Sequence, residues 1–104
     1  MKNKTRIRID FNKAKKEADR LDGIAEKLQK YADSNLENSI KGLSSAWTGD
    51  NSRMFLKKEG MIKTKMLKTA RDLRAVAADI RRIAKQIYDA EMQAYEVAAT
   101  RRKK

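Results

Sequence analysis

Acid–base or nucleophilic chemistry in this chain would fall to its carboxylates and hydroxyls with lysine as a base, because it contains no histidine and no cysteine. Such chemistry needs paired carboxylates, or a serine with a base beside it. The acids instead alternate with bases at helical spacing, as in surface ion pairs; they are Asp19, Asp22, Glu26, Asp33, Glu37, Asp72 and Asp79. The hydroxyls cluster without an adjacent base and predict a turn and a helix cap; they are Ser44, Ser45, Thr48 and Ser52. We therefore expect a protein that is not an enzyme.

Binding sites for small groups lack their usual sequence patterns as well. Without cysteine and histidine the chain has no thiolate ligand, no disulfide and no imidazole ligand. It also has no glycine-rich phosphate loop and no zinc spacing. We expect no cofactor, no metal and no small-molecule substrate, and look for function in helices that bind other helices.

The first half of the chain predicts one long helix over residues 10–43. Apolar residues recur in steps of three and four, which keeps one face of a helix apolar; they are Phe11, Ala14, Ala18, Leu21, Ala25, Leu28 and Ala32. Asp10 is the expected N-cap, since its carboxylate can accept hydrogen bonds from the free amides of the first turn. Beyond Ala32 the apolar stripe drifts, which predicts a curved helix.

A second helix is expected over residues 51–98, with a more regular seam that alternates steps of four and three over about five heptads. The seam is the expected partner interface, above all at Ile62, Met66, Leu73, Val76, Ile80, Ile83 and Ile87, and continues through Ala90, Ala94 and Val97. Ala70, Ala77 and Ala84 form a column beside it, where a neighbouring helix could approach closely. The fold class predicted is all-α: a hairpin in one domain spanning 1–104, with an elbow at 44–50 and a basic tail at 99–104.

A hairpin of these dimensions is expected to pair with a second one. The second helix is longer than the first, and its apolar stripe continues past the point where the first helix would cover it. The prediction is a four-helix bundle, with fraying of the last turns as the alternative.

The net charge of +12 favours a foreign partner over self-pairing. Bases outnumber acids by 11 to 8 in residues 1–50 and by 15 to 6 in residues 51–104. Six bases of the second helix fall away from the predicted seam, where they form either a solvated face or a stripe for an anionic partner; they are Lys68, Arg71, Arg74, Arg81, Arg82 and Lys85. A basic nucleic-acid-associated protein is the alternative function, disfavoured because recognition motifs are missing. A membrane-surface helix is less favoured still, because the seam is rich in alanine.

The elbow contains the only tryptophan, in the sequence Trp47, Thr48, Gly49. This motif between two amphipathic helices of a chain of 104 residues resembles the Trp-x-Gly (WXG) family of ESAT-like proteins exported by type VII secretion. The resemblance covers roughly residues 9–99 and implies a hairpin that pairs with another hairpin. It also implies a composite export signal, to which Trp47 and Gly49 contribute, read by the type VII secretion ATPase.

The family's second signal element, a tyrosine followed four residues later by an acid, is incomplete in this chain. Ile87 with Glu91 has the acid without the ring, and is the candidate remnant. This departure and the basic charge make the chain more similar to the small helical companions of LXG toxins, which bind the toxin's helical targeting domain. The resemblance thus implies an acidic or LXG-type hairpin partner.

Tyr88 and Tyr95 lie seven residues apart, on the outward side of the predicted seam. They are either contacts for a third helix or for the secretion machinery, or rings lying over neighbouring arginine stems. The chain shows no apolar run of about 20 residues and no Sec signal. The expected location is the cytoplasm before export, and then the medium or the cell surface.

Overall fold

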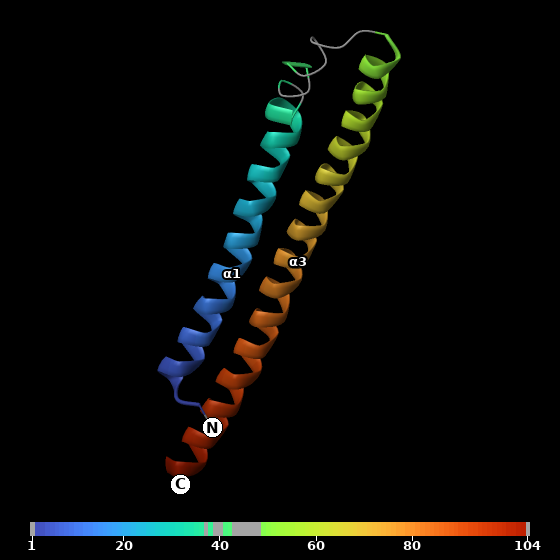
Figure 1. The fold of residues 1–104 in the computed structure, drawn as a ribbon. Coiled ribbons are helices and arrows are strands. Elements are labelled where there is room, and N and C mark those ends of the chain that lie inside the picture. The colour runs from blue at the N-terminus through green and yellow to red at the C-terminus, as the bar shows by residue number, and fades with distance from the viewer. Residues whose placement is uncertain (1, 37, 39–40, 43–48, 104) are drawn as a thin grey trace. The chain divides into compact units, whose positions relative to one another are not determined.

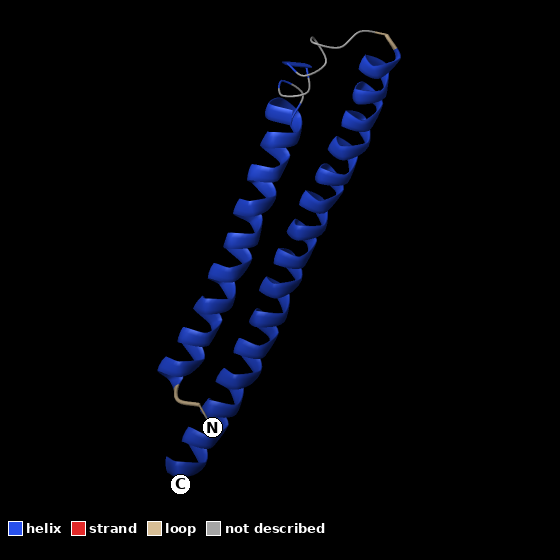
Figure 2. Ribbon diagram, in the orientation of Figure 1, coloured by secondary structure: helices blue, strands red, loops and turns tan. Residues whose placement is uncertain are grey.

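The computed structural model of the chain describes residues 2–36, 38, 41–42 and 49–103. They form α1 (Lys4–Lys30), the π-helical turn η1 (Tyr31–Asn35) and α3 (Asp50–Lys103), in that order (Figure 1). Figure 2 shows helix and no strand in this part of the chain. The two long helices run in opposite directions, which confirms the prediction of an all-α hairpin.

α1 begins six residues earlier than predicted, and its N-cap is Asn3. The Asn3 side-chain oxygen accepts the backbone N–H of Arg6 at 2.8 Å, as an N-cap does. The prediction that Asp10 caps the helix is wrong, because Asp10 lies inside α1. Ile7 shows why: it stands four residues before Phe11, continues the apolar spacing and is buried.

After Lys30 the helix widens for one turn. In η1 the backbone N–H of Leu36 donates to the carbonyl of Tyr31, five residues earlier. A turn that holds an extra residue shifts the positions that follow it, and both Ala32 and Leu36 are buried. The drift of the stripe beyond Ala32 thus coincides with a wider turn.

α3 extends beyond both predicted ends. It begins at Asp50 and continues to Lys103, so the prediction of a separate basic tail at 99–104 is wrong as far as Lys103. Alanine, lysine and arginine are strong helix formers, and bases in the last turn interact favourably with the helix dipole. Nothing in the composition of this segment therefore stops the helix.

The chain divides into two compact units. Unit 1 comprises Met1–Leu21 and Ala75–Lys104, and unit 2 comprises Asp22–Arg74. In unit 1 the first part of α1, blue in Figure 1, runs alongside the last part of α3, drawn in orange and red. Each unit therefore contains a stretch of both helices, and each is described below by itself.

Alanines form the centre of both units. In unit 1, Ala18 of α1 and Ala77 and Ala84 of α3 are buried. In unit 2 the buried alanines are Ala25 of α1, Ala32 of η1 and Ala70 of α3. Helices approach more closely where the facing side chains are small, and each unit has small residues at the contact on both helices. The expected alanine column of α3 is thus the centre of packing within the hairpin.

Candidate partner-binding surface

The seam predicted for α3 is displaced by one residue from the line that α1 covers. Met66, Leu73 and Ile80 are half-buried beside the alanines. Four other members of the predicted interface remain exposed: Ile62 at 45%, Val76 at 47%, Ile83 at 45% and Ile87 at 52%. Val76 and Ile83 lie seven residues apart and Ile87 follows four residues later, steps that are typical of a helix-pairing face, yet α1 leaves all four uncovered. Within the hairpin, these exposed positions are available to a partner.

Contacts in unit 1 show how the two helices are turned toward each other. Asp19 directly follows the buried Ala18, and Arg81 lies one turn after the buried Ala77. The Arg81 guanidinium donates to the Asp19 carboxylate at 2.7 Å (Nη2 to Oδ1). In an antiparallel pair, positions that follow the central residues lie on the same flank, and positions that precede them lie together on the opposite flank. We call the flank of Asp19 and Arg81 the polar flank of unit 1.

Unit 2 has a polar flank of the same construction. Glu26 and Asp33 follow the buried alanines of α1, and Arg74 lies one turn after the buried Ala70. All three line one hollow, together with Asp22, Gln29 and Lys30. Acids of α1 and a base of α3 thus meet on this side, where opposite charges favour the pairing of the two helices.

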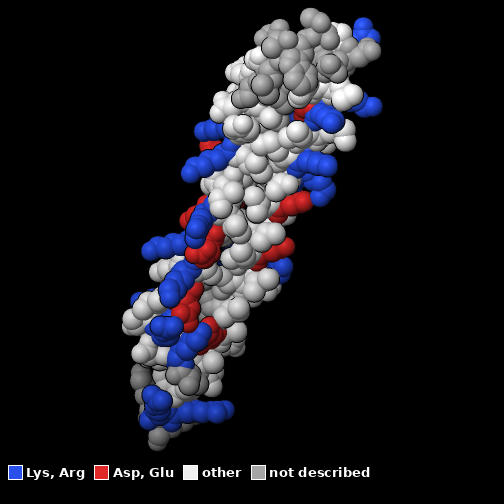
Figure 3. Space-filling model, viewed as in Figure 1, with Lys and Arg blue, Asp and Glu red and all other residues white. Residues whose placement is uncertain are grey.

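These flanks change the interpretation of the basic residues of α3. Arg74 and Arg81 were expected on a free basic face, but both lie opposite acids of α1. Lys68 and Lys85 each bind an acid four residues later, at 2.8 and 2.7 Å. Figure 3 likewise shows red side chains interspersed among the blue ones. Part of the positive charge is therefore compensated within the chain.

On the opposite flank of unit 1, α3 presents a row of aliphatic side chains. Val76 and Ile83 directly precede Ala77 and Ala84, and Ile87 lies one turn beyond Ile83. All three are about half exposed. A row of β-branched side chains at steps of seven and four on one helix is typical of a surface that packs on another helix.

The apolar flank of unit 2 uses both helices. Ile24 and Tyr31 directly precede Ala25 and Ala32, and are 46% and 43% exposed. On α3, the residue that precedes Ala70 is the exposed Thr69, and Ile62 lies seven residues before it. Ile24, Tyr31 and Ile62 therefore share the flank opposite the acids. Of these, only Ile62 belongs to the predicted interface.

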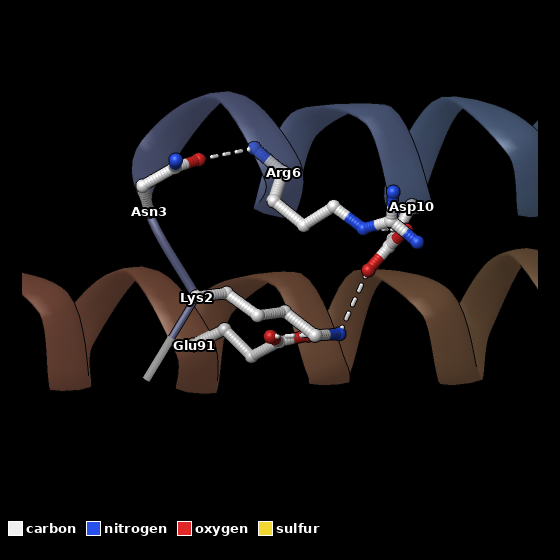
Figure 4. Close-up of polar contacts among 5 residues, drawn as sticks. All are labelled: Lys2, Asn3, Arg6, Asp10 and Glu91. Carbon is white, nitrogen blue, oxygen red and sulfur yellow. Dashed lines mark hydrogen bonds and ion pairs between the residues drawn. The ribbon is translucent and has the colours of Figure 1, made fainter.

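The candidate signal remnant is divided between two environments. Ile87 is exposed, whereas Glu91 binds Lys2, at 3.1 Å from Nζ to the nearer carboxylate oxygen. Lys2 also binds Asp10 at 2.8 Å, and Arg6 binds Asp10 at 3.2 Å (Figure 4). The hydrogen bond from Lys2 holds the pKa of Asp10 below its ordinary value, and the bonds to Asp10 and Glu91 raise the pKa of Lys2. Glu91 thus joins the N-terminal segment to α3.

Tyr88 packs within the hairpin, contrary to the prediction that it points outward. Its ring lies against Phe11 of α1, with the ring centroids 4.7 Å apart. The Lys85 ammonium stands 5.6 Å from the centroid of the same ring, a cation–π contact with a lysine and not the arginine stem of the second alternative. Tyr95 is half-buried. Tyr88 packs inward because the buried alanines of α3, and not the predicted seam, face α1. Tyr88 lies one turn after the buried Ala84 and therefore also faces α1.

Of the elbow motif, the structure describes Gly49 alone. Its φ is +69°, a left-handed conformation that favours glycine, and its carbonyl accepts the N–H of Arg53 at 3.3 Å as α3 begins. Trp47 and Thr48 lie outside the described residues, so the role expected of the ring stays a prediction.

Three features of this surface were missed from the sequence. The first is the start of α1 with its N-cap Asn3, next to Lys2 and its ion pairs. The sequence contained a signal for this helix start, since asparagine is a preferred N-cap and Ile7 extends the apolar spacing. The polar flank also had one, because Asp19, Glu26 and Asp33 recur every seven residues on the same helix. The exposure of Ile24 and Tyr31 had none, because both read as a widening of the seam.

In the described part of the chain, neither helix has an apolar stretch long enough to cross a bilayer. Comparisons of the chain with protein-family models, with curated proteins and with solved structures find no match.

Proposed function

We propose that this chain is a non-catalytic interaction protein of type VII secretion. It acts as a small secreted substrate or a targeting companion, binds a partner helical hairpin such as the targeting domain of an LXG toxin, and presents a composite export signal. The observation that carries the binding function is the exposed row of Val76, Ile83 and Ile87 in unit 1, which has helix-pairing spacing and is left uncovered by α1. The secretion route rests on the resemblance of the Trp47 and Gly49 motif.

Several features of the described residues support binding rather than chemistry. Asp19 of α1 pairs with Arg81 of α3, and Asp22 and Glu26 line a hollow with Arg74, so these acids favour the pairing of the two helices. The exposed aliphatic side chains are costly to leave in water, at about 25 cal/mol per Å² of apolar area. Covering them with a partner's helices would complete a four-helix bundle.

The alternative function, nucleic-acid association, receives less support. Binding to nucleic acid requires unpaired bases that neutralise phosphates, because this neutralisation releases counterions from the nucleic acid. Of the six bases named for an anionic stripe on α3, Arg74 and Arg81 face acids, and Lys68 and Lys85 are paired along the helix; the exposed lysines of α3 lie instead beside the apolar residues. Export with a partner accounts for the apolar row, which a phosphate-binding surface would not need.

The partner-binding function is tested with the helical product of the neighbouring open reading frame. Light scattering after size-exclusion chromatography should show a complex in which each chain contributes one hairpin. Val76→Asn with Ile83→Asn should abolish it, whereas Ala75→Asn with Ala78→Asn, at exposed positions on either side of Val76, should not. A chain that stays monomeric in the mixture contradicts the function proposed here.

Export is tested in a host with and without an active type VII ATPase. The chain should reach the medium only with the active ATPase. Trp47→Ala should lower export while the complex with the partner still forms. Release that does not depend on the ATPase would separate the chain from this route and leave only the binding function.

A further inference from the structure

We infer that the apolar flank of unit 2 receives a helix whose apolar stripe is bordered on both sides by Asp or Glu at seven-residue intervals. This inference rests on the proposed binding function and specifies the chemistry of the partner. It starts from the apolar residues Ile24, Tyr31 and Ile62, which are exposed on one flank of the unit.

Lysines border this apolar flank on both helices. On α1, Lys27 lies three residues after Ile24 and four before Tyr31. On α3, Lys58 and Lys65 lie four before and three after Ile62. These spacings place each lysine next to the apolar residues, on the side away from the buried alanines. We call Lys27, Lys58 and Lys65 the lysine rim.

The lysine rim is uncompensated. All three lysines are exposed, and none forms an ion pair with another described residue. The acids of this unit whose side chains the structure describes lie elsewhere: Asp72 binds Lys68, Asp22, Glu26 and Asp33 line the hollow of the polar flank, and Glu59 is half-buried.

The positions of the rim correspond to those that choose partners in coiled coils. Residues that border an apolar seam at heptad spacing pair with charges of the opposite sign on the neighbouring helix. A helix laid on Ile24, Tyr31 and Ile62 would have Lys27 on one side and Lys58 and Lys65 on the other, and both sides favour acids. A second copy of this chain would instead bring its own lysine rim against this one, which opposes self-pairing.

The test uses the full chain and three synthetic helical peptides of about four heptads. All carry leucine along the seam, and the bordering positions are Glu, Gln or Lys. Titration by fluorescence anisotropy at low salt should rank them Glu, then Gln, then Lys, with the Glu peptide bound about tenfold tighter than the Gln peptide, or about 1.4 kcal/mol. The preference should shrink at high salt.

Two double variants make this ranking specific to the rim. Lys27→Glu with Lys65→Glu should reverse the ranking, so that the Lys peptide binds best. Lys16→Glu with Lys57→Glu changes the net charge equally, at exposed positions outside the apolar flank, and should keep the original ranking. Circular dichroism checks that both variants remain helical.

The inference is overturned if the Gln peptide binds as tightly as the Glu peptide, or if the rim reversal leaves the ranking unchanged. Self-association that excludes the peptides would overturn it as well. The inference is also overturned if phosphatidylserine vesicles bind the chain through the lysine rim while the Glu peptide binds no more tightly than the Gln peptide. If the natural partner still requires Val76 and Ile83 in any of these cases, the proposed function survives and only the acidic border is refuted.

Discussion

Arg81 of α3 donates to Asp19 of α1 across unit 1, with 2.7 Å between Nη2 and Oδ1. The two residues stand 62 positions apart in the sequence, and both follow a buried alanine of their own helix. The contact therefore fixes which flank of the pair is polar and, by the geometry of antiparallel helices, which flank is left apolar.

The pair between Arg81 and Asp19 should contribute a small, salt-sensitive stabilisation. Both side chains are partly exposed, so a double-mutant cycle with Arg81→Ala and Asp19→Ala should give a coupling of about 0.2–1 kcal/mol. Urea denaturation at low and high salt measures it. The pair Lys68 and Asp72, within one helix, is the control and should couple by about 0.3–0.5 kcal/mol. A coupling that does not respond to salt would contradict an ionic interaction.

Asp10 should make stability depend on pH on the acid side. Its hydrogen bond from Lys2 lowers its pKa in the folded state, so the stabilisation is present above the unfolded-state pKa and is lost as pH falls through the folded-state pKa. Asp10→Asn should therefore lower the melting temperature at about pH 6 and have little effect at about pH 2. Thermal melts across this range measure the difference.

Glu17→Gln is the control for that series, because Glu17 is exposed on the same helix and forms no ion pair with a described residue. Lys2→Ala should reproduce the effect of Asp10→Asn, since it removes the donor. An Asp10→Asn effect that is equal at both ends of the range would show that the amide loses packing rather than an ion pair.

The displaced seam predicts opposite tolerance at two adjacent residues. Ala77 is buried between the helices, so Ala77→Leu should overpack the contact and destabilise the fold by about 1–3 kcal/mol. Val76 is exposed, so Val76→Leu should change stability by less than about 0.5 kcal/mol. Urea denaturation followed by circular dichroism measures both. Equal tolerance at the two positions would mean that the helices do not pack on the alanine column.

Two glycines should respond to alanine with opposite signs. Gly49 has a φ of +69°, so Gly49→Ala should cost about 1 kcal/mol or more. Gly60 lies inside α3, and Gly60→Ala should stabilise by about 0.5–1 kcal/mol. At both sites a Cβ would meet no described atom within 4 Å, so the comparison isolates backbone conformation. Stabilisation by Gly49→Ala would contradict the left-handed turn.

Some of the candidate surface was predictable from local patterns. Apolar steps of three and four gave both helices, and the interface residues Ile62, Val76, Ile83 and Ile87 were identified as apolar positions that need covering. Helix ends were predicted less well. Asn3, and not the acid Asp10, caps α1, and α3 continues to Lys103 through the basic segment that was expected to be a tail. The assignment of Tyr88 to the outside failed because it assumed the wrong central column.

The sequence by itself determined that the chain forms two amphipathic helices, because the period of its apolar residues is local and repeats without interruption. It also determined that alanines recur every seven residues on both helices. Only the tertiary structure decided which of two adjacent columns on α3 faces α1. The apolar face of α3 is wide enough for either, and the choice depends on the side chains across the contact. Small residues on α1 favour close packing on Ala70, Ala77 and Ala84, and this leaves Ile62, Val76, Ile83 and Ile87 in water.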